Sequence, residues 1–422
     1  MDLEFSEDDL YLATGAGDQT CRIIDMAAQK PLHTLSGHSS SIKRVHFQPG
    51  GNNRILTSCS RDGTINIWDL RIGNGHRPSE RLSCTSSDLA TATSDLPADA
   101  PRDSIRGAHP DDRHAHNASS KTKAARRREG ASVTSLVFLG NGREHLLATS
   151  SEANAAIKLW DMRMSYDGRG FRPLPVSTTP RPSSHQTHRQ FGLTSMALST
   201  DHARLYALCR DHTVYTYSTS HLILGHAPEL TLGSMRARRA GGAERQGLGP
   251  LYGFRHPRLE TSTFYTKLSV RPQKDDQREI LAAGSGTGDA VLFSTDERSF
   301  RHRSAGLGSA SPISSPAPTR CHVQSSISSP AEVAATTPIH QHGTALIRGH
   351  RKEVTSSTWT TGGYLVTISD DFNVRRWREG VGAQELRAAG EAEGKRWMSG
   401  WADVDPSLDN DEDDDEDDGR CQ

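Results

Sequence analysis

A repeated block is the feature that most constrains this chain, and its clearest copy runs from Gly37 to Arg71. The block opens with Gly-His and closes with Trp68-Asp69. Between these lie three short β-prone runs, separated by Pro-Gly-Gly-Asn and Arg-Asp-Gly turns, which predict three antiparallel strands. A block of roughly 40 residues with this opening and this ending is typical of one blade of a WD-type β-propeller.

Five further units share a small turn residue followed six positions later by an apolar or aromatic residue. Alternating apolar residues between these positions favour strands in every unit. We therefore expect an all-β WD-repeat β-propeller over residues 1–378, with about six blades visible. The first unit has no Gly-His before it, so its blade is expected to be truncated, and six blades or an incomplete ring of seven both fit. The units end near Ile24, Trp68, Trp160, Tyr217, Phe293 and Trp377.

The spacing within each unit has a structural cause. The turn aspartate can accept a hydrogen bond from the Gly-His histidine, which is linked through Ser or Thr to the Trp N–H. Buried polar groups without such partners would cost several kcal/mol. A structural role is therefore favoured over a catalytic one for His38, Ser58 or Ser60, Asp62 and Trp68 in the second unit, and for His350, Thr367 or Ser369, Asp371 and Trp377 in the last.

Long polar segments separate the units. Only 34% of the residues are hydrophobic and the mean hydropathy is −0.63, which is polar for a fully folded chain. Such segments bury too little apolar surface to offset their chain entropy. We expect disordered insertions at about 72–130, 164–189, 221–260 and 297–342, and a disordered tail at 379–422 that ends in an acidic run.

Two arginines follow a Trp-Asp pair at the same spacing. Arg71 comes after Trp68-Asp69, and Arg163 comes after Trp160-Asp161 in the next unit. Strand alternation places Asp69 and Arg71 on one side as the strand ends. The planar guanidinium suits a desolvated protein interface. Contact with a protein partner and ordinary solvated arginines both fit the residues alone.

Other charged residues carry weaker signals. A basic cluster in a predicted loop fits nuclear import or a solvated charge run. Two arginines that precede turn aspartates fit a cationic substrate contact near the central channel, although solvated arginines are favoured. The cluster comprises Lys121, Lys123, Arg126, Arg127 and Arg128, and the two turn arginines are Arg61 and Arg210.

Several classes of function have no support in the residues. No nucleophile motif, phosphate loop or zinc spacing occurs, so we expect no enzyme, no cofactor and no metal. The six cysteines are scattered without a C-x-x-C pair, which favours reduced thiols. No apolar run is long enough to span a membrane, and no nucleic-acid recognition module is visible.

The order of the units resembles the denticleless family, the WD-repeat substrate receptors of cullin-four RING ubiquitin ligases. Matching stretches extend from Ala13 to Arg378, and Gly107-Ala108-His109 lies beside a long insertion of the kind that this family carries. The most distinctive match is Ser262-Thr263-Phe264-Tyr265-Thr266-Lys267-Leu268-Ser269, a strand opening that generic propellers do not share.

The resemblance implies a seven-bladed propeller in the nucleus that binds rather than catalyses. It would dock on the β-propeller adaptor of the ligase, and through it on the cullin and RING subunits. It would present degrons displayed on DNA-loaded PCNA, including replication-licensing and cell-cycle regulators destroyed in S phase and after DNA damage. The family's adaptor motif matches Asp69, Arg71, Asp161 and Arg163. The alternative is a scaffold of another nuclear complex, in chromatin or RNA processing.

Overall fold

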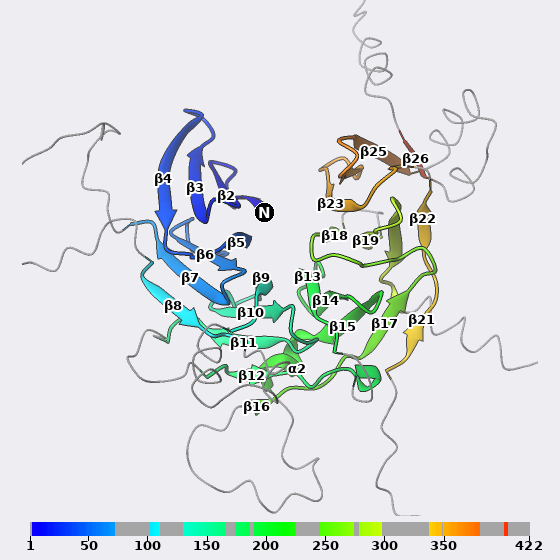
Figure 1. Cartoon of the computed structure of the whole chain (residues 1–422), viewed down its shortest axis with the longest axis horizontal. Coiled ribbons are helices and arrows are strands. Elements are labelled where there is room, and N and C mark those ends of the chain that lie inside the picture. The colour runs from blue at the N-terminus through cyan, green and yellow to red at the C-terminus, as the bar shows by residue number, and fades with distance from the viewer. Residues whose placement is uncertain are drawn as a thin grey trace, which may run out of the picture.

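The computed structural model describes residues 2–71, 101–109, 130–164, 174–185, 190–224, 245–273, 278–297, 337–347, 349–379 and 401–403. Within these residues the fold is six mainly antiparallel β-sheets of the WD type, each built around four strands, and two of them add a short parallel strand. Figure 1 shows the sheets side by side in an open arc, with β1 to β4 at one end and β23 to β26 at the other. This confirms the predicted class of fold and the six predicted units.

The strands follow the chain order closely, and among the described strands only β16 and β21 join their sheet from a later part of the sequence. Sheet 1 holds β1 (Asp2–Phe5), β2 (Tyr11–Gly15), β3 (Thr20–Asp25) and β4 (Lys30–Ser36); sheet 2 holds β5 (Ile42–Phe47), β6 (Ile55–Ser60), β7 (Thr64–Asp69) and β8 (Asp103–Arg106). Sheet 3 holds β9 (Val133–Phe138), β10 (Leu146–Ser151), β11 (Lys158–Asp161), β12 (Ser177–Thr178) and β16 (Arg245–Gln246).

The second half of the chain repeats the arrangement. Sheet 4 holds β13 (Leu193–Leu198), β14 (Arg204–Cys209), β15 (Thr213–Ser218), β17 (Tyr252–Arg255) and β21 (Ile339–His340). Sheet 5 holds β18 (Leu268–Arg271), β19 (Ile280–Gly284), β20 (Ala290–Ser294) and β22 (Thr344–Leu346); sheet 6 holds β23 (Val354–Trp359), β24 (Leu365–Ser369), β25 (Val374–Glu379) and β26 (Trp401–Asp403). The short helices are η1 (Ser183–His185) and α2 (Thr219–Leu224).

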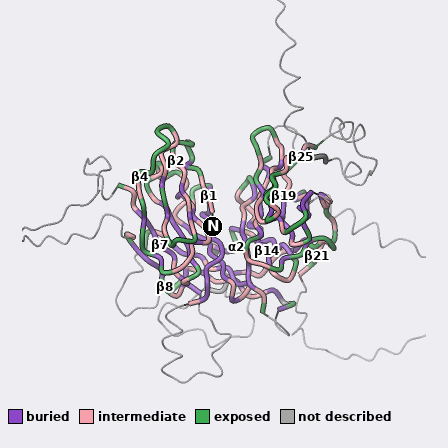
Figure 2. The backbone as a smooth tube through the Cα atoms, turned by 45° about the horizontal axis from the view of Figure 1, so that its top comes forward, coloured by how far each residue is buried: buried purple, intermediate pink, exposed green. Residues whose placement is uncertain are grey.

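The core lies between neighbouring sheets. Five buried apolar clusters each join one sheet to the next around the arc, and Figure 2 shows buried stretches along the strands of these sheets. Between sheets 1 and 2, for example, Cys21 and Ile23 pack with Val45, Leu56 and Trp68. Burial of apolar side chains from both partners therefore fixes the order of the sheets.

Each sheet has two ends with different residues. In sheet 2, the Asp62 turn joins β6 to β7, whereas Asp69 closes β7 at the other end. A six-residue strand spans roughly 20 Å, so these two ends are well separated. We call the end with the Asp62 turn the turn face and the end with Asp69 the motif face.

Parts of the predicted insertions form strands. β8, β12, β17 and β21 lie within the four segments expected to be disordered, as do β16, η1 and most of α2, and β26 lies in the predicted tail. The prediction of disorder is therefore wrong for these residues. Most of these strands add to the outer side of a sheet, where the pairing is one-sided and the apolar pattern is weak. The rest of these segments lies outside the described residues.

The truncation expected for the first unit does not reach its strands. Sheet 1 has all four, and β1 pairs with β2 from Asp2–Gly15 to Phe5–Leu12. What the unit lacks is the Gly-His pair, because that dipeptide would precede β1. Among the described residues, no helix has the length and apolar character needed to cross a membrane.

Candidate functional site

The buried network of sheet 2 has the predicted partners. His38 Nε2 lies 2.7 Å from Ser58 Oγ, and Trp68 Nε1 donates to the same oxygen at 2.8 Å. His38 Nδ1 lies 3.3 Å from Asp62 Oδ2. Burial alone would raise the pKa of Asp62, but hydrogen bonds from His38 and Thr64 lower it overall, so the carboxylate stays charged. These groups are satisfied structurally and are not arranged for catalysis.

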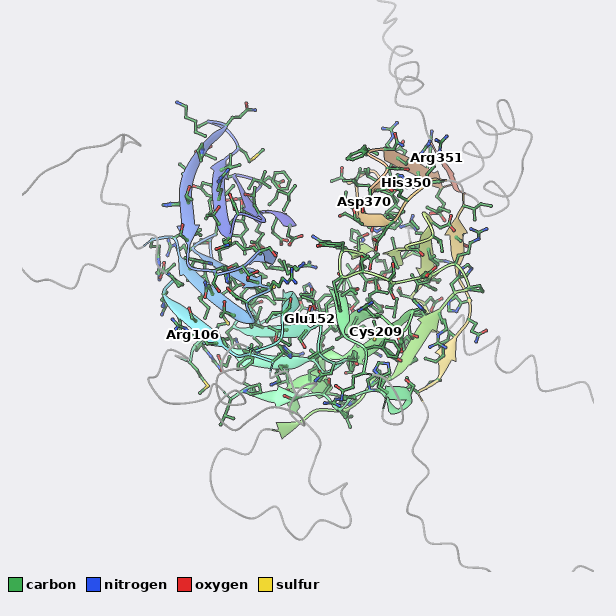
Figure 3. All side chains as sticks on the ribbon, in the orientation of Figure 1. Arg106, Glu152, Cys209, His350, Arg351 and Asp370 are labelled. Atoms are coloured by element: carbon green, nitrogen blue, oxygen red, sulfur yellow. The ribbon has the colours of Figure 1, made fainter. Side chains whose placement is uncertain are left out.

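Sheet 6 repeats this network at the other end of the arc. His350 Nε2 lies 2.8 Å from Thr367 Oγ1, to which Trp377 Nε1 donates at 2.9 Å. His350 Nδ1 lies 3.3 Å from the Asp371 carboxylate. Figure 3 marks His350 in this last sheet. Of the paired alternatives in the sequence, Ser58 and Thr367 are the linking hydroxyls.

Two further histidines join such networks, although both lie in segments that we predicted to be disordered insertions. His109 Nε2 lies 3.0 Å from Thr149 Oγ1, which also accepts from Trp160 Nε1. His185 Nε2 lies 2.8 Å from Asp211 Oδ2. The signal available for His109 was its position at the end of Gly107-Ala108-His109, which stands where other units have Gly-His.

One group in the described residues has metal-ligand side chains close together. His185, Cys209 and Asp211 offer ligand atoms within 4.8 Å of one another. Burial holds the pKa of the Cys209 thiol well above its usual range, so it stays protonated and is a poor ligand. His185 and Asp211 already bond to each other, and Tyr215 Oη donates to Asp211 at 2.5 Å. His185 and Asp211 therefore form a variant of the buried His–Asp network seen in sheets 2 and 6.

The two Asp-x-Arg pairs share one geometry on the motif face. Arg71 donates through its backbone N–H, Nε and Nη2 to Asp69, the last two at 2.8 and 2.6 Å. Arg163 makes the same three contacts with Asp161, the last two at 2.9 and 2.7 Å. The carboxylates are largely covered, at 3% and 15% exposed, whereas the arginines are 56% and 68% exposed. Each aspartate thus holds a planar cation toward solvent.

The charge states of these pairs are fixed. The hydrogen bond from Arg71 lowers the pKa of Asp69, and the bond from Arg163 lowers that of Asp161. Each carboxylate in turn raises the pKa of its arginine. Both partners therefore remain charged through the physiological range, and the fork of each arginine is pre-organised for a protein interface.

A third arginine, which the sequence analysis missed, completes this surface. Arg102 Nη1 lies 3.7 Å from Asp69 Oδ2, and its side chain is 55% exposed. It immediately precedes β8, in a segment predicted to be disordered. One signal could have found it. In sheet 1 the outer strand β4 comes directly before Gly37-His38, and Arg102 lies at the corresponding place, a few residues before Gly107-Ala108-His109.

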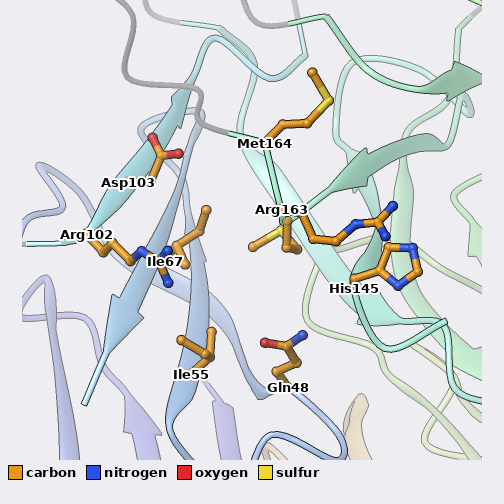
Figure 4. Close-up of a pocket in the computed structure, with 9 residues that line it drawn as sticks. Gln48, Ile55, Ile67, Arg102, Asp103, His145, Arg163 and Met164 are labelled. Carbon is orange, nitrogen blue, oxygen red and sulfur yellow. The ribbon is translucent and has the colours of Figure 1, made fainter. Parts of the chain in front are cut away.

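A pocket of about 500 Å³ lies between sheets 2 and 3 beside these arginines. Figure 4 shows Arg102 on one side of it and Arg163 on the other. Apolar groups form much of its wall, including Ile55, Ile67 and Met164. Gln48 Nε2 donates to Glu144 O at 3.0 Å and links the two sheets at this edge. The motif face thus combines exposed cations with an apolar recess.

The remaining predicted site residues lie elsewhere. Arg61 is exposed beside the Asp62 turn, and Arg210 is half-buried beside the Asp211 turn, so both belong to the turn face. Arg210 is engaged with the chain itself, since Nη2 donates to Ser262 O at 2.7 Å. The basic cluster Lys121, Lys123, Arg126, Arg127 and Arg128 lies outside the described residues, as does the acidic run.

Comparisons with known proteins give one matching repeat family and several similar sequences. The WD domain, G-beta repeat family matches residues 1–25 and 29–69. The chain is 28% identical over 387 residues to the cell division cycle protein cdt2 of Schizosaccharomyces pombe, covering 90% of this chain and 58% of that protein. It is 24% identical over 401 residues to the human denticleless protein homolog, covering 94% and 42%.

A fly relative and one solved structure extend the comparison. The Drosophila melanogaster protein lethal(2)denticleless is 24% identical over 397 residues, covering 93% of this chain and 40% of the relative. A chain in the crystal structure of the mitotic checkpoint complex aligns with a TM-score of 0.47 at 14% identity, covering 89% and 73%. This chain therefore spans about half the length of the curated relatives it matches.

The fold and the buried His–Ser/Thr–Trp networks define a WD-repeat β-propeller protein. Within that class, the similarity extends along about nine-tenths of the chain, well past the repeats that any WD protein shares. The chain is similar to cdt2 and to proteins that carry the denticleless name.

Proposed function

We propose that this chain is a non-catalytic substrate receptor of a cullin-four RING ubiquitin ligase. Its motif face docks on the β-propeller adaptor of that ligase, and through the adaptor on the cullin and RING subunits. It presents degron-bearing cell-cycle and replication-licensing regulators on DNA-loaded PCNA for ubiquitination and proteasomal degradation. The chain contributes binding, and the ubiquitin transfer belongs to its partners.

One observation carries the proposal. Two neighbouring sheets present arginines on the same face, each held by a covered aspartate in the same two-pronged contact. An exposed arginine that merely solvates the surface has no need of such a fixed partner. Arginine is also among the residues that dominate protein interfaces when desolvated. The apolar pocket between Arg102 and Arg163 gives the same face a place for an apolar side chain of the adaptor.

The relatives support the cell-cycle part of the proposal. One is named as a cell division cycle protein, and the others carry the name of the denticleless family that the sequence resembles. The basic cluster from Lys121 to Arg128 supports a nuclear location, because short Lys/Arg-rich runs serve in nuclear import.

Replacing both motif arginines tests the docking. We expect Arg71→Ala with Arg163→Ala to abolish co-purification of the adaptor and cullin with the tagged full chain. Removal of an interface arginine of this kind weakens binding on the order of 30-fold or more. Asp69→Asn with Asp161→Asn should weaken it less, by about 3-fold to 10-fold, because the arginines remain but lose their charged anchor.

A matched control uses Arg22→Ala with Arg106→Ala. Both arginines are exposed and lie on strands β3 and β8, away from the two motifs, and Arg22 is also paired with an aspartate. This variant should retain the adaptor. If the folded Arg71/Arg163 variant still recovers adaptor and cullin at the wild-type level, the motif face is not the docking surface. Recovery of a chromatin or RNA-processing complex instead would favour the scaffold alternative.

A further inference from the structure

The distinctive segment Ser262–Lys267, here named the mouth segment, lies on the turn face just before β18. Two other sheets, one of them next to sheet 5 and the other not, place cations over its rings. Arg210, from sheet 4, carries its guanidinium 4.6 Å above the ring of Phe264. Lys43, from sheet 2, places its ammonium 4.7 Å above the ring of Tyr265. These pairs lie next to the central channel rather than at the outer edge.

The mouth segment also reaches the two sheets at the ends of the arc. Lys267 Nζ pairs with Asp2 of β1, and Thr263 Oγ1 bonds to Glu353, which precedes β23. The ring of Tyr265 is exposed, whereas Thr261 before it and Thr266 after it are fully buried. One short stretch of sheet 5 therefore contacts sheets 1, 2, 4 and 6 and lies across the mouth of the channel.

A WD blade does not require such a stretch. In sheet 2, the corresponding link from His38 to β5 is only Ser39-Ser40-Ser41. The mouth segment instead holds Tyr265 with 51% of its side chain exposed, while the surrounding contacts restrain its backbone. An exposed ring on a restrained segment is the arrangement expected of a recognition surface.

A third cation and ring are paired on the same face. Phe372, in the turn between β24 and β25, is 94% exposed, and Lys352 Nζ lies 6.0 Å over its ring. Its φ is 65°, a left-handed conformation that costs a bulky residue about 1 kcal/mol or more. The same turn position in sheet 2 is held by Gly63, at φ 79°. Nothing in the blade requires a phenylalanine here.

A cavity of about 770 Å³ opens beside these groups. Lys43, Phe264, Tyr265 and Lys267 line one part of it, and Asp370 lines another. Figure 3 marks Asp370 next to His350 and Arg351 in the last sheet. The turn face therefore offers apolar ring surface, several cations and room for an inserted segment.

We propose that the mouth segment and its flanking cations bind an extended peptide of a partner protein in which carboxylates stand beside apolar side chains. The exposed parts of Tyr265 and Phe372 take the apolar groups, and Lys43, Arg210 and Lys352 attract the carboxylates. The inference rests on the proposed function in one respect: if the chain is a substrate receptor, the partner protein that carries this peptide is its substrate.

A protein partner fits this surface better than a nucleic acid. Bases would stack on open ring faces, but Lys43 and Arg210 already cover one face of Tyr265 and one of Phe264. Carboxylates also lie around the opening, at Asp2 and Asp370. They would repel a continuous phosphate backbone, whereas a peptide can place its few charges between them.

Fluorescence anisotropy with defined probes tests the proposal. The full chain is titrated into a short fluorescein-labelled peptide that alternates Asp with Leu and Phe, into the same peptide with Lys for Asp, and into oligothymidine. We expect binding of the acidic peptide, and at least about tenfold weaker binding after Lys43→Glu with Arg210→Glu. Tyr265→Ala should also weaken binding without changing the melting temperature, because the ring is half exposed.

The control pair is Lys30→Glu with Arg106→Glu, which makes the same charge change on exposed residues of the outer strands β4 and β8. It should leave peptide binding unchanged. Tighter binding of the basic peptide or of oligothymidine overturns the proposal, as does unchanged binding by both the folded Lys43/Arg210 variant and Tyr265→Ala.

The same variants separate this inference from the proposed function. Lys43→Glu with Arg210→Glu should still co-purify the adaptor, since those residues lie on the turn face and Arg71 lies on the motif face. Adaptor recovery without peptide binding defeats the inference and leaves the receptor function standing. Peptide binding without adaptor recovery leaves the inference standing and points to another kind of complex.

Discussion

The Ser58 hydroxyl joins two buried rings, and its removal affects both. It accepts from Trp68 Nε1, and it donates to His38 Nε2 because Nδ1 of that ring faces the Asp62 carboxylate. Ser58→Ala would leave both ring nitrogens buried without a partner, at about 1–3 kcal/mol for each. We expect the free energy of unfolding, measured by urea denaturation, to fall by about 2–4 kcal/mol.

Ser60→Ala is the matched control, two residues along the same strand. Its hydroxyl donates to the carbonyl oxygens of Ser40 and Ser41, which can accept from water if the loop relaxes. A loss of about 1 kcal/mol is expected there. Equal losses for the two variants would contradict the assignment of Ser58 as the link in the network.

At the same scale, the sequence could predict which residue types meet but not which hydroxyl is used. Ser58 and Ser60 are two apart, so both point to one face of β6. Ser58 is selected only because Trp68, on the paired strand β7, packs with its Nε1 toward the Ser58 hydroxyl. The motif arginines were found because each follows Trp-Asp at a fixed spacing, whereas Arg102 has no local motif and reaches Asp69 only through the tertiary fold.

Among the elements, inner and outer strands differ in how well the sequence predicts them. β6 and β7 are packed on both faces and paired on both edges, which gives them regular apolar patterns. β12 has only two residues and β8 has four, and each adds to a sheet that is already formed. Their position before a Gly-His or Gly-Ala-His stretch, as for β4, β8 and β22, is a better signal than their composition.

The outer strand β26 gives a test at this scale. Its residues pair with β25 from Trp377–Asp403 to Glu379–Trp401. A chain ending after residue 379 would leave the edge of β25 unpaired, which favours association with other strands. We expect it to melt at a lower temperature than the full chain and to aggregate more on heating, as followed by circular dichroism and light scattering.

A chain ending after residue 403 is the matched control. It removes the acidic run but keeps β26, so its melting temperature should match that of the full chain at moderate salt. If both truncations melt alike, β26 contributes nothing to the stability of sheet 6.

On the scale of the whole molecule, the two ends of the arc both expose apolar side chains. Asp2 and Glu4 of β1 face sheet 2, so Leu3 and Phe5 point the other way and are exposed. At the other end, Ile368 pairs with Val374, and both are exposed. Leu3, Phe5 and Ile368 line the same cavity. The sequence left six blades and an incomplete ring of seven both open, and it could not show which side chains the two ends would expose.

These uncovered faces predict self-association of the 422-residue chain. Exposed apolar side chains gathered on a sheet face favour contact with a similar surface. Sedimentation velocity should therefore give a mass that rises with protein concentration, and Phe5→Ser with Val374→Ser should reduce this rise. Because both side chains are exposed, the two changes should leave the melting temperature nearly unchanged.

Leu10→Ser with Leu32→Ser, which alters exposed leucines of sheet 1 outside β1, should leave the association in place. A monomer at every concentration would contradict this prediction.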